Sequence, residues 1–202
     1  MKYIIFDIGN VLADFQWKQY LNSLFSDEKT REVLTKAYWD YELWREMDRG
    51  AMPQSTIKRE LLRIAAAEGY EKEMQLSYER IGECIWQFSY AKDWIRELKA
   101  AGYKVYYLSN YSRYLIAENP RALDFTELMD GGIYSCDVQL LKPDLAIYDM
   151  LCRRYELDPK ECLFLDDKLI NVIAARECGL HSLVFTNYEE MKPAVDAYLK
   201  EH

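Results

Sequence analysis

Five polar residues in the chain are of types that could together act on an anionic substrate. Asp7, Asp166 and Asp167 supply carboxylates, Ser109 supplies a hydroxyl, and Lys142 supplies a positive charge. Two adjacent carboxylates repel each other, so Asp166 and Asp167 are easier to explain with a cation nearby. Lys142 stands at a predicted helix start, where the helix dipole favours an anion rather than a lysine. Each residue alone is commonly a cap, a turn residue or a solvated side chain, so function depends on whether the fold brings them together.

Short apolar runs are expected to position these residues. Asp7, Ser109 and Asp166 each directly follow such a run. The runs cover residues 3–6, 105–108 and 163–165, and a further strand is expected over 182–185. Runs of this kind are typical of strands covered on both faces, as in a parallel sheet. Because ligands bind such sheets at the carboxyl ends of the strands, we expect the polar groups to converge there.

Helical patterns alternate with the strands. They are centred on residues 94–101, 148–155, 169–173 and 189–199. Leu169, Val172 and Ile173 mark the third of these helices, and Gly131-Gly132 is interpreted as a turn before a strand. The alternation predicts an α/β fold, in which an open parallel sheet with right-handed crossovers is flanked by helices.

Residues 15–88 break this alternation. They hold no clear strand, and their apolar residues recur at helical spacing. We therefore predict two domains: an α/β core made of residues 1–14 and 89–202, and a helical insert made of residues 15–88.

Composition narrows the possible partners and the compartment. The formal net charge is −8, which argues against nucleic-acid binding, although one metal ion and one lysine can still attract an anionic substrate. The five cysteines form no CxxC pair, which fits reduced thiols in a cytoplasmic protein. No apolar stretch approaches 18 residues, so no membrane span is expected. The oligomeric state cannot be read from the sequence.

Four short motifs in order resemble those of the haloacid dehalogenase superfamily. They are Ile4-Ile5-Phe6-Asp7-Ile8-Gly9-Asn10-Val11-Leu12, Leu108-Ser109-Asn110, Lys142-Pro143, and Phe164-Leu165-Asp166-Asp167 with Asn171. The resemblance implies a Rossmann-like hydrolase core with a small all-helical cap in the position of residues 15–88. Bacterial relatives with a similar Asp-x-Gly-Asn-Val opening include sugar-phosphate phosphatases of the sugar-1-phosphate type.

The resemblance also implies roles for the residues that would act on the substrate. Asp7 would be the nucleophile and would form an aspartyl-phosphate intermediate. Ser109 would donate a hydrogen bond to a phosphate oxygen, and Lys142 would spread positive charge over the phosphoryl group. Asn110 belongs to the same expected substrate-binding set.

A magnesium site is implied by the same resemblance. Mg²⁺ would bind Asp7, the backbone carbonyl of Gly9, and Asp166. Asp167 would order the outer shell of the metal, and Asn171 would support the loop.

Gly9 departs from the pattern of the superfamily's phosphatases, which usually carry a second aspartate two residues after the nucleophile. That aspartate is a general acid–base, and such a group typically accelerates the reaction by a factor of about 10²–10⁴. Without it, the rate is expected to depend steeply on the basicity of the leaving group. If another group supplies the proton, Asp14 and acids of the cap are the first candidates.

The sequence therefore predicts a magnesium-dependent phosphatase acting on a small phosphorylated metabolite, with sugar phosphates among the candidates. Inward-facing cap aromatics would select the substrate, with Trp17, Tyr41 and Trp44 as candidates. One alternative is a 2-haloacid dehalogenase, which needs no metal but leaves the acidic pair unexplained. Another is a non-catalytic ligand-binding protein that lost turnover with the acid at position 9.

Overall fold

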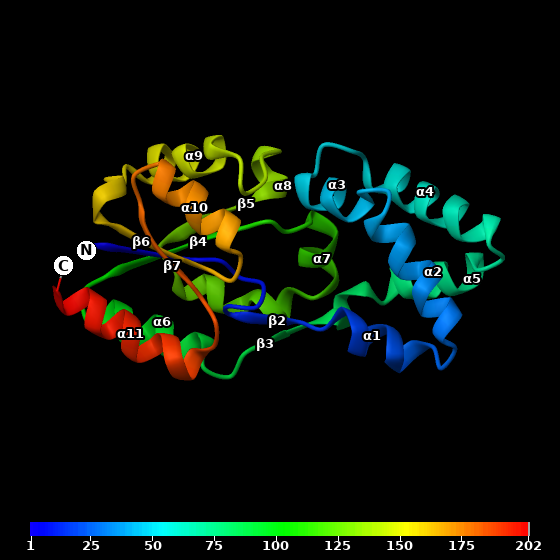
Figure 1. Ribbon diagram of the computed structural model, residues 1–202, viewed down its shortest axis with the longest axis horizontal. Coiled ribbons are helices and arrows are strands. Elements are labelled where there is room, and N and C mark those ends of the chain that lie inside the picture. The colour runs from blue at the N-terminus through cyan, green and yellow to red at the C-terminus, as the bar shows by residue number, and fades with distance from the viewer. Residues whose placement is uncertain (202) are drawn as a thin grey trace.

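A five-stranded parallel sheet forms the centre of the computed structural model, which describes residues 1–201 (Figure 1). The strand order is β5-β4-β1-β6-β7. The strands are β1 (Tyr3–Phe6), β4 (Lys104–Ser109), β5 (Gly131–Tyr134), β6 (Cys162–Asp166) and β7 (His181–Val184). The prediction of an open parallel α/β sheet is confirmed, and every strand that the sequence indicated is present.

The sheet register aligns the ends of the three central strands. Phe6 pairs with Tyr107 of β4 on one side and with Leu165 of β6 on the other. All five residues of β6 are buried, as are the last three of β1. Because both faces of these strands are buried, they appear in the sequence as uninterrupted apolar runs.

Helices cover both faces of the sheet (Figure 1). Ile4 and Phe6 of β1 share one hydrophobic cluster with α6 (Ala91–Ala100) and α11 (Tyr188–Glu201), and Ile5 faces a second cluster built from α9 (Leu145–Tyr155) and α10 (Leu169–Glu177). Shorter helical segments are α7 (Arg113–Glu118), η2 (Pro120–Leu128), α8 (Ser135–Val138) and η3 (Pro159–Glu161). No helix within residues 1–201 is both long enough and apolar enough to cross a membrane.

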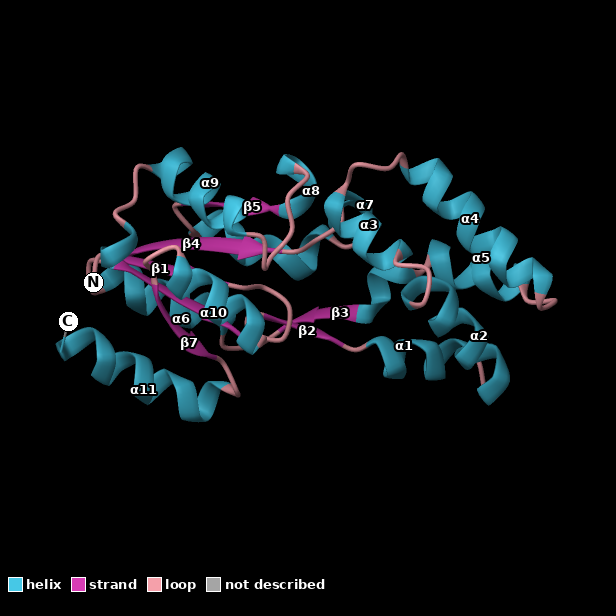
Figure 2. Ribbon diagram, turned by 45° about the horizontal axis from the view of Figure 1, so that its top comes forward, coloured by secondary structure: helices cyan, strands magenta, loops and turns pink. Residues whose placement is uncertain are grey.

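The insert consists mainly of five helices beside the carboxyl edge of the sheet. They are α1 (Trp17–Leu24), α2 (Glu28–Trp39), α3 (Leu43–Arg49), α4 (Gln54–Ala67) and α5 (Glu71–Glu79), followed by η1 (Ile81–Cys84). The expectation that residues 15–88 hold no strand is wrong. An antiparallel ribbon of β2 (Ala13–Phe15) and β3 (Ile85–Gln87) joins the insert to the core (Figure 2). Strands of three residues are too short to show a periodicity, and the domain boundaries at residues 15 and 88 stay a prediction.

The Gly131-Gly132 pair lies inside β5 rather than in a turn before it, so this interpretation of the sequence is also wrong. A Cβ atom on Gly132 would lie 2.3 Å from the Tyr107 ring, and one on Gly131 would lie 2.5 Å from the Tyr155 ring. The glycines are therefore required by aromatic side chains packed on the strand.

The helix expected around residues 169–173 is confirmed as α10, but only Val172 of its three marker residues is buried. Leu169 is 58% exposed and Ile173 is 45% exposed. The helix instead buries Ala174 and Ala175, whose small side chains let its axis lie close to the sheet.

Candidate active site

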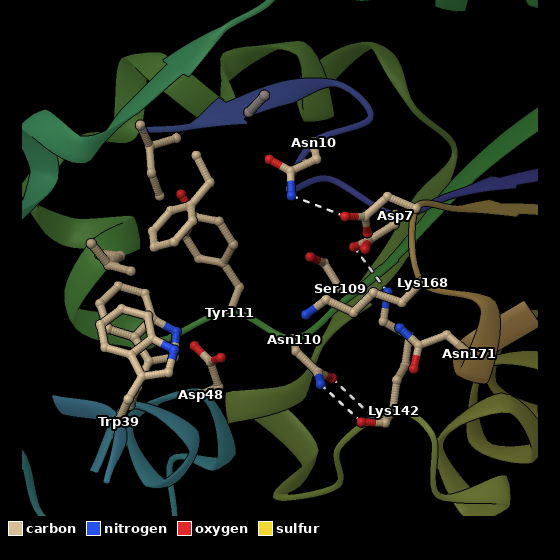
Figure 3. A pocket seen from close by; sticks show the side chains of 17 residues that line it. Asp7, Asn10, Trp39, Asp48, Ser109, Asn110, Tyr111, Lys142, Lys168 and Asn171 are labelled. Atoms are coloured by element: carbon tan, nitrogen blue, oxygen red, sulfur yellow. Dashed lines mark hydrogen bonds and ion pairs between the residues drawn. The ribbon is translucent and has the colours of Figure 1, made fainter. Parts of the chain in front are cut away.

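Polar side chains converge where the central strands end, as the sequence predicted (Figure 3). Asp7 directly follows β1, Ser109 ends β4, and Asp166 ends β6. A cavity of about 200 Å³ lies between this edge and α3 of the insert. Asp7, Gly9, Ser109, Asn110, Lys142, Asp167 and Asn171 all line it.

Asp7 uses one carboxylate oxygen for structural contacts. Its Oδ1 accepts a hydrogen bond from the Ile8 backbone N–H at 2.7 Å and lies 2.9 Å from Lys142 Nζ. Residues 1–201 place no hydrogen bond on Oδ2, which leaves that oxygen available to the cavity. Burial raises the pKa of Asp7 to about 7, the Asp166 carboxylate adds to the rise, and the Lys142 ammonium opposes it.

Lys142 connects the two central carboxylates. Its Nζ lies 2.9 Å from Asp7 Oδ1 and 2.6 Å from Asp166 Oδ2, and it donates to the Leu108 carbonyl at 2.8 Å. The side chain is only 1% exposed. Burial acts to lower the pKa of Lys142, but the Asp166 and Asp7 carboxylates outweigh it and raise the pKa above its usual value. The lysine is therefore a fixed cation at the strand ends.

Asn110 and Ser109 lie between these groups. The Asn110 side chain accepts from the Lys142 backbone N–H at 2.8 Å and donates to its carbonyl at 3.0 Å. Its amide thereby positions the lysine, and a direct contact of Asn110 with substrate stays a prediction. Ser109 is buried and lines the cavity.

The adjacent acids have different surroundings. Asp166 pairs with Lys142, accepts from the Lys168 backbone N–H at 2.8 Å, and accepts from Asn171 Nδ2 at 3.0 Å through both oxygens. Burial opposes ionisation of Asp166, but the Lys142 ammonium lowers its pKa below the ordinary value. Asp167 accepts from Asn10 Nδ2 at 2.9 Å through Oδ2, whereas its buried Oδ1 has no partner within residues 1–201.

The acidic cluster fits a divalent cation. Asp7, Asp166 and Asp167 each offer an oxygen, and these oxygens lie within 4.8 Å of one another. An unpartnered buried carboxylate oxygen is costly unless a cation or a donor satisfies it. The all-oxygen donor set suits a hard ion such as Mg²⁺. Asn171 supports the cluster, because its side chain is buried and its backbone carbonyl accepts a hydrogen bond from the Tyr148 hydroxyl at 2.9 Å.

Gly9 also lines the cavity, and its backbone has room for a side chain. A Cβ atom added there would meet nothing within 4 Å, and the φ angle lies outside the left-handed region. The left-handed conformation falls on the next residue, Asn10, with φ of 58°. Asparagine tolerates this region better than most residues, and this conformation accompanies the Asn10 contact with Asp167.

The insert contributes cavity residues that the sequence did not single out. They are Phe15, Trp39 and Asp48. Tyr111 and Lys168, which the sequence analysis also did not single out, line the cavity from the core. Figure 3 shows Trp39 and Asp48 on one side of the cavity and Asp7 and Asn171 on the other. Trp44 and Asp48 are four residues apart on α3, so they share a helix face, and this spacing is the signal that could have revealed Asp48.

Only Trp44 of the three proposed specificity residues lines the cavity. Its ring stacks on Trp39 with centroids 4.8 Å apart. Trp17 is 7% exposed, and its indole donates to the Thr35 hydroxyl inside the insert. Tyr41 is 58% exposed and is absent from the cavity wall.

Comparisons of sequence agree with this geometry. A family model described as haloacid dehalogenase-like hydrolase matches residues 1–179. The chain is 26% identical over 186 residues to the sesquiterpene phosphatase astK of Aspergillus oryzae, covering 92% of this chain and 90% of that protein. It is 29% identical over 86 residues to (S)-2-haloacid dehalogenase 1 of a Pseudomonas species, covering 43% of this chain and 38% of that protein.

Comparisons of structure give the same fold. A predicted HAD-like family hydrolase from Porphyromonas gingivalis superposes with a TM-score of 0.77 at 22% identity, covering 100% of this chain and 99% of that one. A HAD-family enzyme from Bacteroides thetaiotaomicron, in complex with magnesium and inorganic phosphate, gives a TM-score of 0.71 at 18% identity, covering 92% of this chain and 94% of that one.

Proposed function

Because the chain belongs to the haloacid dehalogenase-like hydrolases, we propose that it is a magnesium-dependent phosphatase acting on small phosphate monoesters through an aspartyl-phosphate on Asp7. The observation that carries the proposal is the acidic cluster of Asp7, Asp166 and Asp167 around the buried Lys142. The full-length similarity to a sesquiterpene phosphatase and the magnesium and phosphate in a structural neighbour support it.

The residues of the chain have distinct tasks in this reaction. The free Oδ2 of Asp7 attacks phosphorus, and the Ser109 hydroxyl donates to a phosphoryl oxygen. The Lys142 ammonium, held between Asp7 and Asp166, offsets the negative charge of the phosphoryl group from beside the nucleophile. Oδ1 stays fixed by Ile8 and Lys142, so the nucleophile keeps one orientation throughout. When bound, Mg²⁺ neutralises charge between the carboxylate of Asp7 and the phosphate dianion.

The contacts of the acidic pair favour an assignment of metal ligands opposite to the sequence expectation. Both oxygens of Asp166 are already occupied by Lys142, the Lys168 backbone and Asn171. Asp167 keeps a buried oxygen without a partner. We therefore assign Asp7, Asp167 and the Gly9 carbonyl as direct ligands, and Asp166 as the group that positions Lys142.

The cavity suits a small phosphorylated metabolite with an apolar face. The stacked Trp39 and Trp44, together with Phe15, form an aromatic wall that can pack against a sugar ring or a hydrocarbon chain. Sugar phosphates therefore remain in the substrate class that we propose. A metal-free dehalogenase would have to bind a carboxylate beside the unpartnered oxygen of Asp167, and this repulsion disfavours it.

The test is a phosphate-release screen with added Mg²⁺ over sugar phosphates, nucleotides, phospho-acids and isoprenoid phosphates. We expect release from at least one class, loss of release with a chelator, and restoration by Mg²⁺. Asp7→Asn should remove turnover while the far-ultraviolet circular dichroism stays unchanged. Halide release from a 2-haloacid in metal-free protein, with no phosphate release, would contradict the proposal.

A further inference from the structure

The cavity contains a carboxylic acid that neither the nucleophile nor the metal site uses. Among residues 1–201, three acids line the cavity: Asp7, Asp48 and Asp167. Asp7 is the proposed nucleophile and Asp167 a proposed metal ligand, which leaves Asp48. Position 9, two residues after the nucleophile, is a glycine and supplies no proton.

Asp48 is held against the core although it belongs to the insert. It lies in the last turn of α3, which packs against α7 and α8. The buried Ser135 hydroxyl donates to the Asp48 carbonyl and accepts from the Tyr111 backbone N–H at 2.9 Å. A single hydroxyl thus links Asp48 to the loop that follows Ser109. Gly50, two residues further, touches Cys136 so closely that a Cβ atom there would lie 2.8 Å from it.

The Asp48 side chain points into the cavity from the side opposite the strand ends (Figure 3). The Trp44 side chain, one turn earlier on α3, lines the same cavity and acts to lower the pKa of the Asp48 carboxylate. An acid that protonates a leaving group must stand beyond the phosphorus as seen from the nucleophile, because the nucleophile and the leaving group lie in line. Asp48 occupies that side of the cavity.

We propose that Asp48 is the general acid–base of the phosphatase reaction, replacing the aspartate that is missing at position 9. This inference rests on the proposed function. In the first step the Asp7–phosphorus bond forms, the bond from phosphorus to the leaving oxygen breaks, and Asp48 gives its proton to that oxygen. In the second step Asp48 takes a proton from water as the water oxygen attacks phosphorus. The Asp7–phosphorus bond then breaks, inorganic phosphate leaves, and Asp48 is protonated again.

The surroundings of Asp48 suit a group that must both give and take a proton near neutral pH. Burial raises the pKa of Asp48 to about 7, Lys168 opposes the rise, and the Asp7 carboxylate adds to it. An acid–base group is most effective when its pKa lies near the working pH. The charged groups that face it are Lys168, Lys142 and Asp7, and the titratable neutral groups are Tyr111 and Cys136.

Asp14, the other acid suggested by the sequence, is placed less well. It lies on β2, its carboxylate accepts a hydrogen bond from the Gln16 side chain, and it does not line the cavity. It therefore provides a matched control.

The experiment compares wild type, Asp48→Asn and Asp14→Asn on a series of phosphate esters from p-nitrophenyl to alkyl leaving groups. For alkyl esters, Asp48→Asn should lower kcat by about 10²–10⁴. For p-nitrophenyl phosphate, the first step needs no acid but the second still needs a base. Asp48→Asn should therefore release one p-nitrophenol per active site in a burst and then accumulate phosphorylated Asp7, detected by intact mass and peptide mapping. Asp14→Asn should behave like wild type.

Each outcome decides the inference. A burst with a trapped phosphoenzyme supports it and shows that the variant is folded. A folded Asp48→Asn within a few-fold of wild type, or one reduced equally for every leaving group without a phosphoenzyme, overturns it in favour of a binding role. A steep dependence of wild-type kcat/KM on leaving-group basicity also overturns it, without any variant. Absence of phosphate release by wild type across the substrate screen refutes the proposed function itself, and this inference with it.

Discussion

A half-buried Asp48 has a cost in stability that can be measured without a substrate. The pKa of Asp48 is raised from an ordinary value of 3.8 to about 7, and burial is the largest cause. The folded state therefore holds this proton up to about pH 7, whereas the unfolded chain loses it near pH 4. Between these values the unfolded state binds fewer protons, so this carboxylate makes stability fall as pH rises. The penalty is absent below about pH 4 and complete above about pH 7.

At about 1.36 kcal/mol per pKa unit, the full difference in pKa would lower the free energy of unfolding by about 4 kcal/mol above pH 7. Water can enter the cavity and relax the charged form, so we expect about 2 kcal/mol. Asp48→Asn should therefore raise the free energy of unfolding by about 2 kcal/mol at pH 8 and by almost nothing at pH 4. The measurement is urea unfolding of metal-free protein at both pH values. The burial penalty of Asp7 is present in both proteins and cancels from the difference, whereas its repulsion of Asp48 is part of the effect that is measured. An Asp48→Asn variant that is no more stable at pH 8, or equally stabilised at both pH values, would refute this reasoning.

Two further predictions test the metal ligands and the cavity wall. Asp167→Asn should raise the Kd for Mg²⁺, measured by calorimetry, by more than Asp166→Asn, whose indirect effect we expect to be about 10–100-fold; the reverse order would restore Asp166 as the direct ligand. Trp44→Ala should change the ratio of kcat/KM between substrates of different shape, whereas Tyr41→Ala should leave that ratio unchanged. If Trp44→Ala lowers kcat/KM by the same factor for every substrate, the tryptophan has only a structural role.

The elements that could be predicted from the sequence are those whose signal is local. The strands before Asp7, Ser109 and Asp166 are buried on both faces, so they appear as apolar runs that stop at a polar residue. The glycines of β5 carry no such signal, because their requirement comes from the rings of Tyr107 and Tyr155 elsewhere in the chain. The sequence shows that a glycine pair is present but not which ring will approach it.

In the site, too, the residue types are visible in the sequence, whereas the long-range contacts between them are not. The residue types of Asp166 and Asp167 are identical, and only the family resemblance suggested different roles for them. The contacts that lead us to propose the opposite assignment depend on Lys142, 24 residues earlier, which contacts Asp166. Asp48 was missed because its position depends on how α3 packs against the core through Ser135, a contact between residues 87 positions apart. The family motifs identify the groups that we propose act on phosphorus, whereas the packing of the insert determines which further side chains line the cavity.

The absence of an acid at position 9 leads to the last prediction, which concerns Gly9→Asp. A Cβ atom at this position would meet no neighbour within 4 Å, and the left-handed conformation of the loop belongs to Asn10 rather than to Gly9. The backbone can therefore accept a Cβ atom without strain, and we expect the Gly9 carbonyl to stay available to the proposed metal. If Asp48 already supplies the proton, Gly9→Asp in wild type should change the leaving-group dependence very little.

The same substitution placed on Asp48→Asn should have a large effect. Asp48→Asn is expected to lower kcat for alkyl esters by about 10²–10⁴. A carboxylate at position 9 should raise kcat of that variant at least about tenfold and should shorten the lifetime of the phosphoenzyme. The measurement is single-turnover formation and decay of the phosphoenzyme in all four proteins, with Mg²⁺ affinity checked in each. A residue that only binds substrate cannot be replaced by an acid carried on another segment of the chain. Failure of Gly9→Asp to rescue a folded, metal-binding Asp48→Asn protein would therefore argue that Asp48 contacts substrate without moving a proton.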